Sequence, residues 1–309
     1  MVKVDLITGF LGAGKTTFLL KYAKYLLSKG EKIGILEYDY GAVNVDMLLL
    51  RELRSESCEL EMLAAACDED CLKRRFKTKL IAMAMSGYNR VIIEPSGVFD
   101  MDMFFDALRD EPLENWYEID NVITIVNANL KSDLGEEADF VLASQASSAG
   151  CIVLSRTQLS NEKEVSEAKA HIEASAEKIK CRGFQPKYFE KDWETLNEDD
   201  FQYLSHCGYH VGSYVKTVSS DNSTFSSVSF LHAKMDIDKA KQIIGELLTN
   251  KEYGSIFRIK GFASENGINY EIQATNYETE LHETAKGQGV LIVIGSNINE
   301  SKIKELIET

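Results

Sequence analysis

Short apolar runs rich in β-branched residues alternate with longer amphipathic stretches along the first half of the chain. The short runs are typical of buried strands, and the longer stretches are typical of helices. Strands that alternate with helices in this way usually form a mainly parallel sheet with helices on both faces. The predicted strands are Val2–Thr8, Lys32–Tyr38, Arg90–Glu94, Asn121–Asn127 and Cys151–Leu154, and the predicted helices are Thr16–Ser28, Leu72–Met85, Met101–Leu108 and Lys163–Ala176.

The pattern changes after residue 185. Residues 186–223 are polar, aromatic and irregular, and we interpret them as a connecting region. Regular patterns then resume and predict a smaller α+β domain at 224–309, following an α/β, doubly wound first domain at 1–185. Its predicted strands are Ser227–His232, Ser255–Lys260, Tyr270–Ala274 and Val290–Ile294, with helices at Ile237–Leu248 and from Glu300.

Charge and composition exclude several classes of protein. The 309 residues carry a net charge of −15, which repels nucleic-acid backbones and anionic membrane surfaces. The longest apolar runs are far shorter than the roughly 20 residues that span a bilayer. Six cysteines, and no cleavage site after the first apolar residues, favour a reducing, cytoplasmic compartment. We therefore expect no nucleic-acid partner and no membrane.

The most specific motif is Gly9-Phe10-Leu11-Gly12-Ala13-Gly14-Lys15-Thr16, a GxxxxGKT pattern between a predicted strand and a predicted helix. Backbone N–H groups of such a loop, together with the helix N-terminus, bind phosphates. We expect Lys15 to reach the β- and γ-phosphates and the Thr16 hydroxyl to ligate Mg²⁺. The predicted nucleotide-binding residues are Gly9, Leu11, Gly12, Ala13, Gly14, Lys15, Thr16 and Thr17.

A second candidate motif, Glu94-Pro95-Ser96-Gly97, ends another predicted strand. A carboxylate at the carboxyl end of a parallel strand lies where doubly wound sheets bind ligands. We expect Glu94 to hold a Mg²⁺-bound water or to orient the attacking water. We expect the Gly97 N–H to face the γ-phosphate, so that this turn senses hydrolysis.

These motifs, GFLGAGKTT and EPSG, occur with Phe257-Arg258-Ile259-Lys260-Gly261-Phe262 near the C-terminus. Together they resemble the CobW/HypB/UreG family of P-loop GTPases, and in particular its CobW-like branch. The resemblance implies a nucleotide-switched metal chaperone or insertase that delivers Zn²⁺, Co²⁺ or Ni²⁺, or assists cobalamin metabolism. Its partners would be a nucleotide and a client metalloprotein or cofactor enzyme, and a homodimer stays open.

The chain departs from the family at the metal motif. Family members usually carry CxCC, whereas this chain has Cys67-Asp68-Glu69-Asp70-Cys71. A mixed site of Cys67, Asp68, Asp70 and Cys71 is one interpretation, and carboxylates would shift its preference toward harder metals. The alternative is an acidic helix N-terminus. His206, Cys207 and His210 form a second metal candidate, for which a solvated loop is the alternative.

The base-reading motif NKxD is also altered, because Ser155-Arg156-Thr157-Gln158 stands at its expected place. The family aspartate accepts two hydrogen bonds from guanine, and such charge-assisted bonds contribute more than neutral ones. The Gln158 amide should bind guanine less well than that aspartate, and it could instead donate to adenine N1 and accept from adenine N6. The sequence therefore predicts nucleotide contacts from Ser155, Arg156 and Gln158, and leaves GTP and ATP both open.

The first switch segment retains a carboxylate but loses other family residues. Asp39 could approach Mg²⁺ with Thr16 and Glu94, whereas Tyr38 replaces the family asparagine. We therefore assign Lys15, Glu94 and Asp39 to catalysis, and expect hydrolysis that is slow or needs a partner. The leading hypothesis is a nucleotide hydrolase that couples nucleotide state to metal delivery. The alternative is a nucleotide-dependent adaptor with little hydrolysis and no metal of its own.

Overall fold

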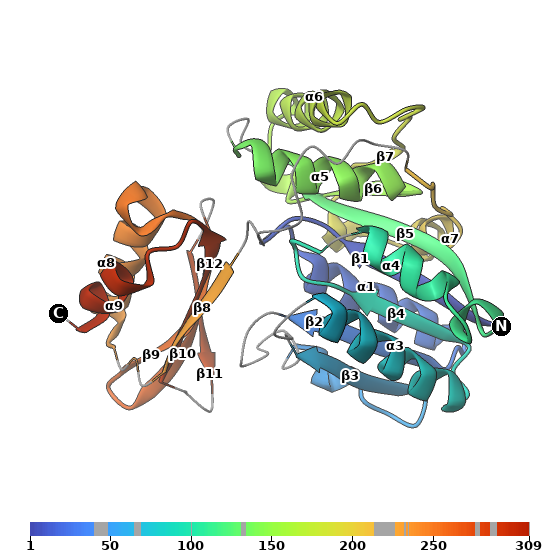
Figure 1. Cartoon of the computed structure of the whole chain (residues 1–309), viewed down its shortest axis with the longest axis horizontal. Coiled ribbons are helices and arrows are strands. Elements are labelled where there is room, and N and C mark those ends of the chain that lie inside the picture. Colours follow the sequence, from blue (N-terminus) through green and yellow to red (C-terminus); the bar gives the residue numbers. More distant parts are fainter. Residues whose placement is uncertain are drawn as a thin grey trace. The chain divides into compact units, whose positions relative to one another are not determined.

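The computed structural model of this chain divides into two units, Met1–Ser219 and Ser220–Thr309 (Figure 1). It describes residues 1–39, 49–64, 69–99, 101–130, 134–212, 226–231, 233, 235–275, 279–284 and 289–308. For residues 39, 64, 69, 70, 226, 227, 229 and 231 it describes the backbone alone.

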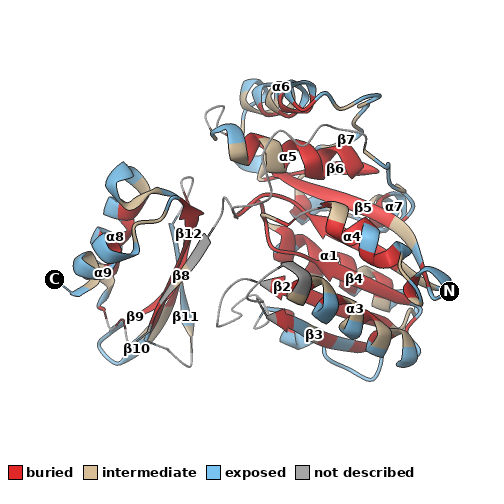
Figure 2. Cartoon of the chain, viewed as in Figure 1, coloured by how far each residue is buried: buried red, intermediate tan, exposed pale blue. Residues whose placement is uncertain are grey.

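Seven parallel strands form the sheet of the first unit, in the order β3-β2-β4-β1-β5-β6-β7. Because β1 is the central strand, the GxxxxGKT loop at its carboxyl end lies near the middle of the sheet, beside the carboxyl ends of β4 and β5. The strands β4 and β6 are buried along their whole length (Figure 2). The strands are β1 (Val2–Thr8), β2 (Ile33–Asp39), β3 (Cys58–Ala64), β4 (Arg90–Glu94), β5 (Tyr117–Asn127), β6 (Cys151–Ser155) and β7 (Tyr188–Phe189).

Helices cover both faces of this sheet. One core contains Phe18 and Tyr22 of α1 with Leu204 of α7, packed on one side of the strands. The opposite face packs against α3 and α4 around Phe76 and Phe104, and against α5 and α6 farther along. The predicted doubly wound, mainly parallel sheet is thus confirmed. The helices are α1 (Lys15–Ser28), α3 (Glu69–Met85), α4 (Met101–Arg109), α5 (Glu136–Ser148), α6 (Glu162–Lys178) and α7 (Glu198–Leu204).

The stretch that we expected to be an irregular connection contains regular structure. Residues 186–212 hold β7 and α7, and Phe201 and Leu204 of α7 are buried in the core of the first unit. The pattern did not reveal these elements because β7 has two residues and α7 has seven, too few to show a period. The chain also has β3 and α5, which the apolar pattern did not predict.

An antiparallel sheet with two helices forms the second unit, in the strand order β11-β10-β9-β12-β8. Its helices pack on Ile259 and Val293 to make a separate core. The unit adds one edge strand, β11, to those predicted. Its elements are β8 (Ser226–Leu231), α8 (Ile237–Thr249), β9 (Ser255–Glu265), β10 (Ile268–Thr275), β11 (Thr279–Thr284), β12 (Val290–Ser296) and α9 (Glu300–Glu308).

The charged residues of the Phe257–Phe262 segment lie in the middle of this sheet. Arg258 donates to Gln273 Oε1 on β10 at 3.1 Å, and the Lys260 side chain is buried. Among the described helices of both units, none is long and apolar enough to cross a membrane.

Candidate nucleotide site

The glycine-rich loop leaves β1 and enters α1 through backbone conformations that favour glycine. Gly9, Gly12 and Gly14 have φ angles of 146°, 75° and 97°. A Cβ on Gly9 would lie 2.2 Å from the carbonyl oxygen of Ile125, so no side chain fits there. No acidic residue occupies the first turn of α1. The N-terminus of α1 therefore keeps its partial positive charge for an anion.

The first two residues of α1 carry the side chains that the motif predicts. Lys15 and Thr16 are 6% and 8% exposed. The Thr16 hydroxyl donates to Glu94 Oε1 at 2.8 Å, and Glu94 is itself buried at the end of β4. The structure thus brings together Thr16 and Glu94, with Lys15 buried at the start of the same helix, whereas Thr17 is exposed. Two hard oxygen atoms beside a lysine and a helix N-terminus suit Mg²⁺ and a phosphate chain.

The turn after Glu94 packs directly on the glycine-rich loop. A Cβ on Gly97 would lie 2.5 Å from the backbone nitrogen of Leu11 and 2.9 Å from its Cα. The turn is closed by a hydrogen bond from the Phe99 N–H to the Ser96 carbonyl at 3.1 Å. Only glycine permits this approach, so the two predicted motifs are in contact at Gly97 and Leu11.

The predicted base-reading loop also contacts the glycine-rich loop. Arg156 has a φ of 57°, and its Nη1 donates to the Gly12 carbonyl at 3.1 Å. Ser155 is buried at the end of β6, whereas Gln158 is exposed on a 3₁₀ turn, Thr157–Leu159. The Gln158 side chain is therefore open to solvent on the loop where the motif predicts a base contact.

Trp193 is a site residue that the sequence analysis missed. Its ring lies 3.3 Å from the position that a Cβ on Gly14 would take, and it packs against Phe18 of α1. Its indole N–H donates to the Leu154 carbonyl at 3.1 Å. Trp193 therefore ties the start of α1 to the end of β6. The sequence held one signal for it, because Trp193 is one of only two tryptophans in the chain and lies in the stretch that we interpreted as a connection.

The first switch segment is only partly described. Asp39 is the last residue of β2, and its side chain, like residues 40–48, lies outside the described part of the chain. Glu37 pairs with Glu94 in the register of β2 and β4, and both side chains are buried. The Tyr38 ring contacts Phe99 edge-on, with 6.0 Å between ring centroids. The tyrosine therefore has a packing partner beside the Glu94–Gly97 turn.

Comparison with known protein families tests the resemblance that the motifs indicate. The nucleotide-binding domain of the CobW/HypB/UreG family matches residues 3–182. This chain belongs to the CobW/HypB/UreG family. The resemblance inferred from its motifs is confirmed.

The matching curated relatives are named for zinc. The zinc chaperone YjiA of Escherichia coli (strain K12) is 30% identical over 185 residues, which is 57% of this chain and 56% of that protein. The zinc-regulated GTPase metalloprotein activator 1 of Schizosaccharomyces pombe (strain 972 / ATCC 24843) is 25% identical over 187 residues, 58% of this chain and 44% of that protein. The matched part thus spans about half the length of these relatives.

The crystal structure of Zn(II)-bound YjiA GTPase from E. coli covers 99% of this chain and 98% of its own, with 16% sequence identity and a TM-score of 0.36.

The expected metal ligands fall largely outside the described residues. Cys67 and Asp68 are not described, and of Asp70 only the backbone is placed, in the first turn of α3. Cys71 is half-buried on α3, where Arg74 Nη2 lies 3.8 Å from its Sγ. The described residues contain no group of three or more potential metal ligands, and this includes the stretch from His206 to His210.

Burial alters the acidity of several other thiols. It raises the pKa of Cys58 to about 11 and that of Cys151 to about 12. Burial likewise raises the pKa of Cys207 well above its usual value. These thiols are therefore weaker acids than an exposed cysteine, and a metal ion would have to displace a more tightly held proton to bind them.

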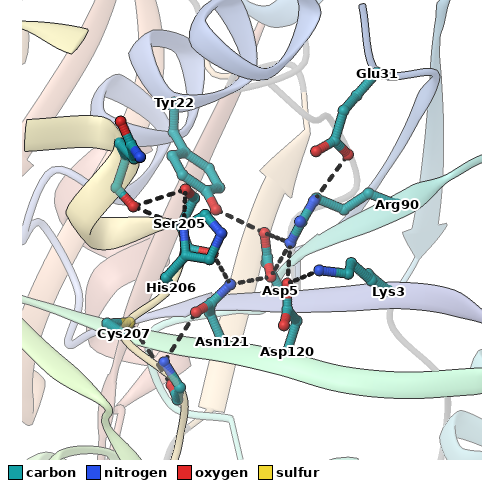
Figure 3. Close-up of polar contacts among 12 residues, drawn as sticks. Lys3, Asp5, Tyr22, Glu31, Arg90, Asp120, Asn121, Ser205, His206 and Cys207 are labelled. Atoms are coloured by element: carbon teal, nitrogen blue, oxygen red, sulfur yellow. Dashed lines mark hydrogen bonds and ion pairs between the residues drawn. The ribbon is translucent and has the colours of Figure 1, made fainter. Parts of the chain in front are cut away.

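A buried charge cluster lies near the amino ends of β1, β4 and β5 (Figure 3). Arg90 Nη1 lies 2.7 Å from both carboxylate oxygens of Asp5 and 2.8 Å from Asp120 Oδ2, while its Nε donates to Glu31 at 3.0 Å. The Tyr22 hydroxyl of α1 also donates to Asp5, at 2.8 Å. The cluster thus links α1, the helix that follows the phosphate loop, to three strands. It lies toward the amino ends of these strands, whereas the phosphate loop lies at the carboxyl end of β1.

The pKa values in this cluster reflect burial and pairing. Burial raises the pKa of Asp5, and its bonds to Arg90, Asn121 and Tyr22 oppose that rise. Burial also acts to raise the pKa of Asp120, but hydrogen bonds from Arg90 and Lys3 outweigh it and lower the pKa below its usual value of 3.8. These groups are ion-paired with one another, which indicates a structural role.

Proposed function

We propose that this chain is a CobW-like protein that binds and hydrolyses GTP and couples its nucleotide state to delivery of a metal ion or metallocofactor to a client protein. The observation that carries the proposal is the contact between the two phosphate motifs. The Thr16 hydroxyl bonds Glu94 at 2.8 Å, and Gly97 packs on Leu11. Both motifs can therefore respond to one phosphate chain.

Mg²⁺ fits the groups at this site. A threonine hydroxyl and a carboxylate are hard oxygen donors, and they already lie within hydrogen-bonding distance of each other. Thr16 and Glu94 would hold the ion directly or through water, with Asp39 as a further candidate at the end of β2. When bound, the ion neutralises charge on the phosphate oxygens.

The protein's own groups supply the rest of the proposed hydrolysis. Water attacks the γ-phosphorus, the bond from that phosphorus to the β,γ-bridging oxygen breaks so that GDP leaves, and one proton of the attacking water passes to an oxygen of the inorganic phosphate that forms. The Lys15 ammonium and the N-terminus of α1 stabilise negative charge on the β- and γ-phosphates. Glu94 orients water, and the Gly97 N–H faces the γ-phosphate. Arg156, bonded to the Gly12 carbonyl, joins the loop expected to hold the base to the loop expected to hold the phosphates.

The metal in this proposal is cargo. The names of YjiA and of the fission-yeast relative support zinc as the first metal to test. The segment from Cys67 to Cys71 is the proposed holding site, since its thiolates and carboxylates are of the types that bind Zn²⁺, Co²⁺ or Ni²⁺.

A metal titration with and without nucleotide tests the coupling. The purified protein is titrated with Zn²⁺, Co²⁺ and Ni²⁺ in the presence of GDP, and again with a non-hydrolysable GTP analogue. The proposal expects metal affinity to differ between the two nucleotides and to fall in the double variant Cys67→Ser, Cys71→Ser. Affinity that ignores the nucleotide, or no metal binding at all, would overturn it.

The adaptor hypothesis stays as a second candidate. Asp68 and Asp70 stand where the family's metal motif has cysteines, and the exposed Gln158 stands where the family has its base-reading aspartate. Both changes favour the adaptor. A single-turnover assay of GTP and ATP hydrolysis separates the two proposals. A rate near that of the uncatalysed reaction, with nucleotide still bound, supports the adaptor.

A further inference from the structure

Gln145 differs from the buried serines Ser144 and Ser147 of α5. The hydroxyls of Ser144 and Ser147 bond carbonyls within α5 itself, at Val141 and Ser144. The Gln145 side chain is fully buried and reaches another element, because its Nε2 donates to the Gly97 carbonyl at 3.2 Å. A carbonyl oxygen can only accept, so this contact also fixes which end of the amide faces the turn.

The bond to Gln145 completes the anchoring of the turn after Glu94. The Ser96 carbonyl is held by the Phe99 N–H, and the Gly97 carbonyl is held by Gln145. The two peptide groups on either side of Gly97 are thus both oriented. Because the N–H and C=O of one peptide group point in opposite directions, anchoring the Ser96 carbonyl also sets the direction of the Gly97 N–H.

Gln145 is in turn fixed to the strand beside the glycine-rich loop. The Thr124 hydroxyl of β5 donates to the backbone carbonyl of Gln145 at 3.0 Å. Thr124 pairs with Thr8, the last residue of β1 before Gly9. The Gln145 Oε1 atom accepts no hydrogen bond from any residue that the structure describes. The hydrogen bond that the structure describes for this buried amide is therefore the one that Nε2 donates to the Gly97 carbonyl.

The C-terminal end of α5 also holds the chain that leads to the second unit. The His210 N–H donates to the Ser148 carbonyl at 3.0 Å. Gly212 lies so close to Ser147 that a Cβ on it would come within 2.4 Å of the Ser147 hydroxyl. One helix therefore contacts both the Gly97 turn and the last described residues before the second unit.

We propose that Gln145 is a positioning residue for triphosphate recognition: it holds the Ser96–Phe99 turn so that the Gly97 N–H faces the γ-phosphate, and it links that turn to α5. This inference rests on the proposed function, in which Gly97 senses the γ-phosphate. It assigns no contact between Gln145 and the nucleotide.

Two variants test this role. Gln145→Met keeps the length of the side chain and removes the donor, and Gln145→Asn keeps the amide but is too short to reach Gly97. Affinities for GDP and for a non-hydrolysable GTP analogue are measured calorimetrically with Mg²⁺. Loss of one buried hydrogen bond predicts that the preference for the triphosphate falls about three- to tenfold in both variants, while GDP affinity changes less than about twofold. Ser144→Ala, on the same helix, is the matched control and keeps the wild-type preference.

The outcomes separate this inference from the proposed function. If wild-type protein prefers the triphosphate and both variants keep that preference, the role of Gln145 is overturned. If the wild type binds both nucleotides equally, the proposed sensing of the γ-phosphate by Gly97 is overturned, and the role of Gln145 with it. Should neither variant fold, hydrogen exchange of the wild type decides. Binding of the GTP analogue is then expected to slow amide exchange both in residues 96–99 and around residue 145, but not in α6. If exchange around residue 145 does not change, the link between Gln145 and the turn is overturned.

Discussion

Thr16 and Glu94 are joined by a hydrogen bond of 2.8 Å between the first turn of α1 and the end of β4. If this pair holds Mg²⁺, Thr16→Ala should weaken nucleotide binding about tenfold or more when Mg²⁺ is present, because a charge-assisted contact contributes about 1.5–3 kcal/mol. Thr16→Ser should retain binding. Calorimetry with Mg²⁺ and with EDTA measures the effect, and Ser28→Ala at the far end of α1 is the control. An equal loss in EDTA would show that Thr16 acts through packing.

Gln158→Asp should move base preference toward guanine. A carboxylate accepts both guanine N–H bonds with charge assistance, so the ratio of GTP to ATP analogue affinity should rise about tenfold. Asn161→Asp adds the same charge three residues away, at the N-cap of α6, where aspartate caps equally well. That variant should leave the ratio unchanged. If Gln158→Asp also leaves it unchanged, Gln158 does not read the base.

Trp193 should report nucleotide binding through its fluorescence. It is 9% exposed and packs beside Gly14, whereas Trp116, the second tryptophan, is 37% exposed. In Trp116→Phe the remaining emission should change when GDP and Mg²⁺ are added. In Trp193→Phe, which keeps Trp116 alone, it should not. Trp193→Ala should lower the free energy of unfolding by about 3–5 kcal/mol, since it removes a large buried ring.

Arg90→Met should strongly destabilise the first unit. It leaves the buried Asp5 carboxylate without its cation, which costs about 3–5 kcal/mol in the free energy of unfolding. Adding Asp5→Asn should recover part of the loss, because the unpaired charge is then gone. Urea denaturation measures both variants. Lys163→Met removes the exposed pair of Lys163 with Glu167, and it should cost far less. A similar cost for both pairs would contradict a structural role for the cluster.

The contribution of Asp120 to stability should depend on pH. Because the pKa of Asp120 is lowered in the folded protein, its stabilising effect is present above the unfolded value of 3.8 and is lost as the pH falls through the lower folded value. Asp120→Asn should therefore cost about 1 kcal/mol or less at neutral pH, since the side chain is partly exposed, and progressively less in strongly acidic solution. Urea denaturation of both proteins across this range measures the difference. A constant difference would exclude titration of Asp120 as the cause.

The parts of this protein that the sequence predicts are those encoded by contiguous residues. Lys15 and Thr16 follow a strand within a single motif, and Glu94 ends an apolar strand, so their places at the sheet edge could be inferred. Strand β3 escaped prediction because Glu59 and Glu61 interrupt its apolar residues, as suits an edge strand. Helix α5 escaped because its buried face includes serines and a glutamine.

Contacts between distant segments account for what the sequence could not show of the site. Trp193 reaches Gly14 only because β7 returns the chain beside β6. Gln145 reaches Gly97 only because α5 packs over the sheet. Neither residue belongs to a contiguous motif, so no spacing rule identifies it. The side chain of Asp39 and residues 40–48 and 65–68 lie outside the described residues, and the expectations placed there stay predictions.

The raised pKa values of several thiols favour selective chemical labelling of this protein. Burial raises the pKa values of Cys58, Cys151 and Cys207, so each carries less thiolate at neutral pH than an ordinary cysteine and should react more slowly with a maleimide or iodoacetamide. Cys71 is half-buried on α3, within the segment proposed to hold the metal. Cys181 and Cys207 are also only partly buried, so in the double variant Cys181→Ser, Cys207→Ser the rate at which a thiol reagent modifies the Cys67–Cys71 segment can be followed, and protection by added Zn²⁺ would report its occupancy.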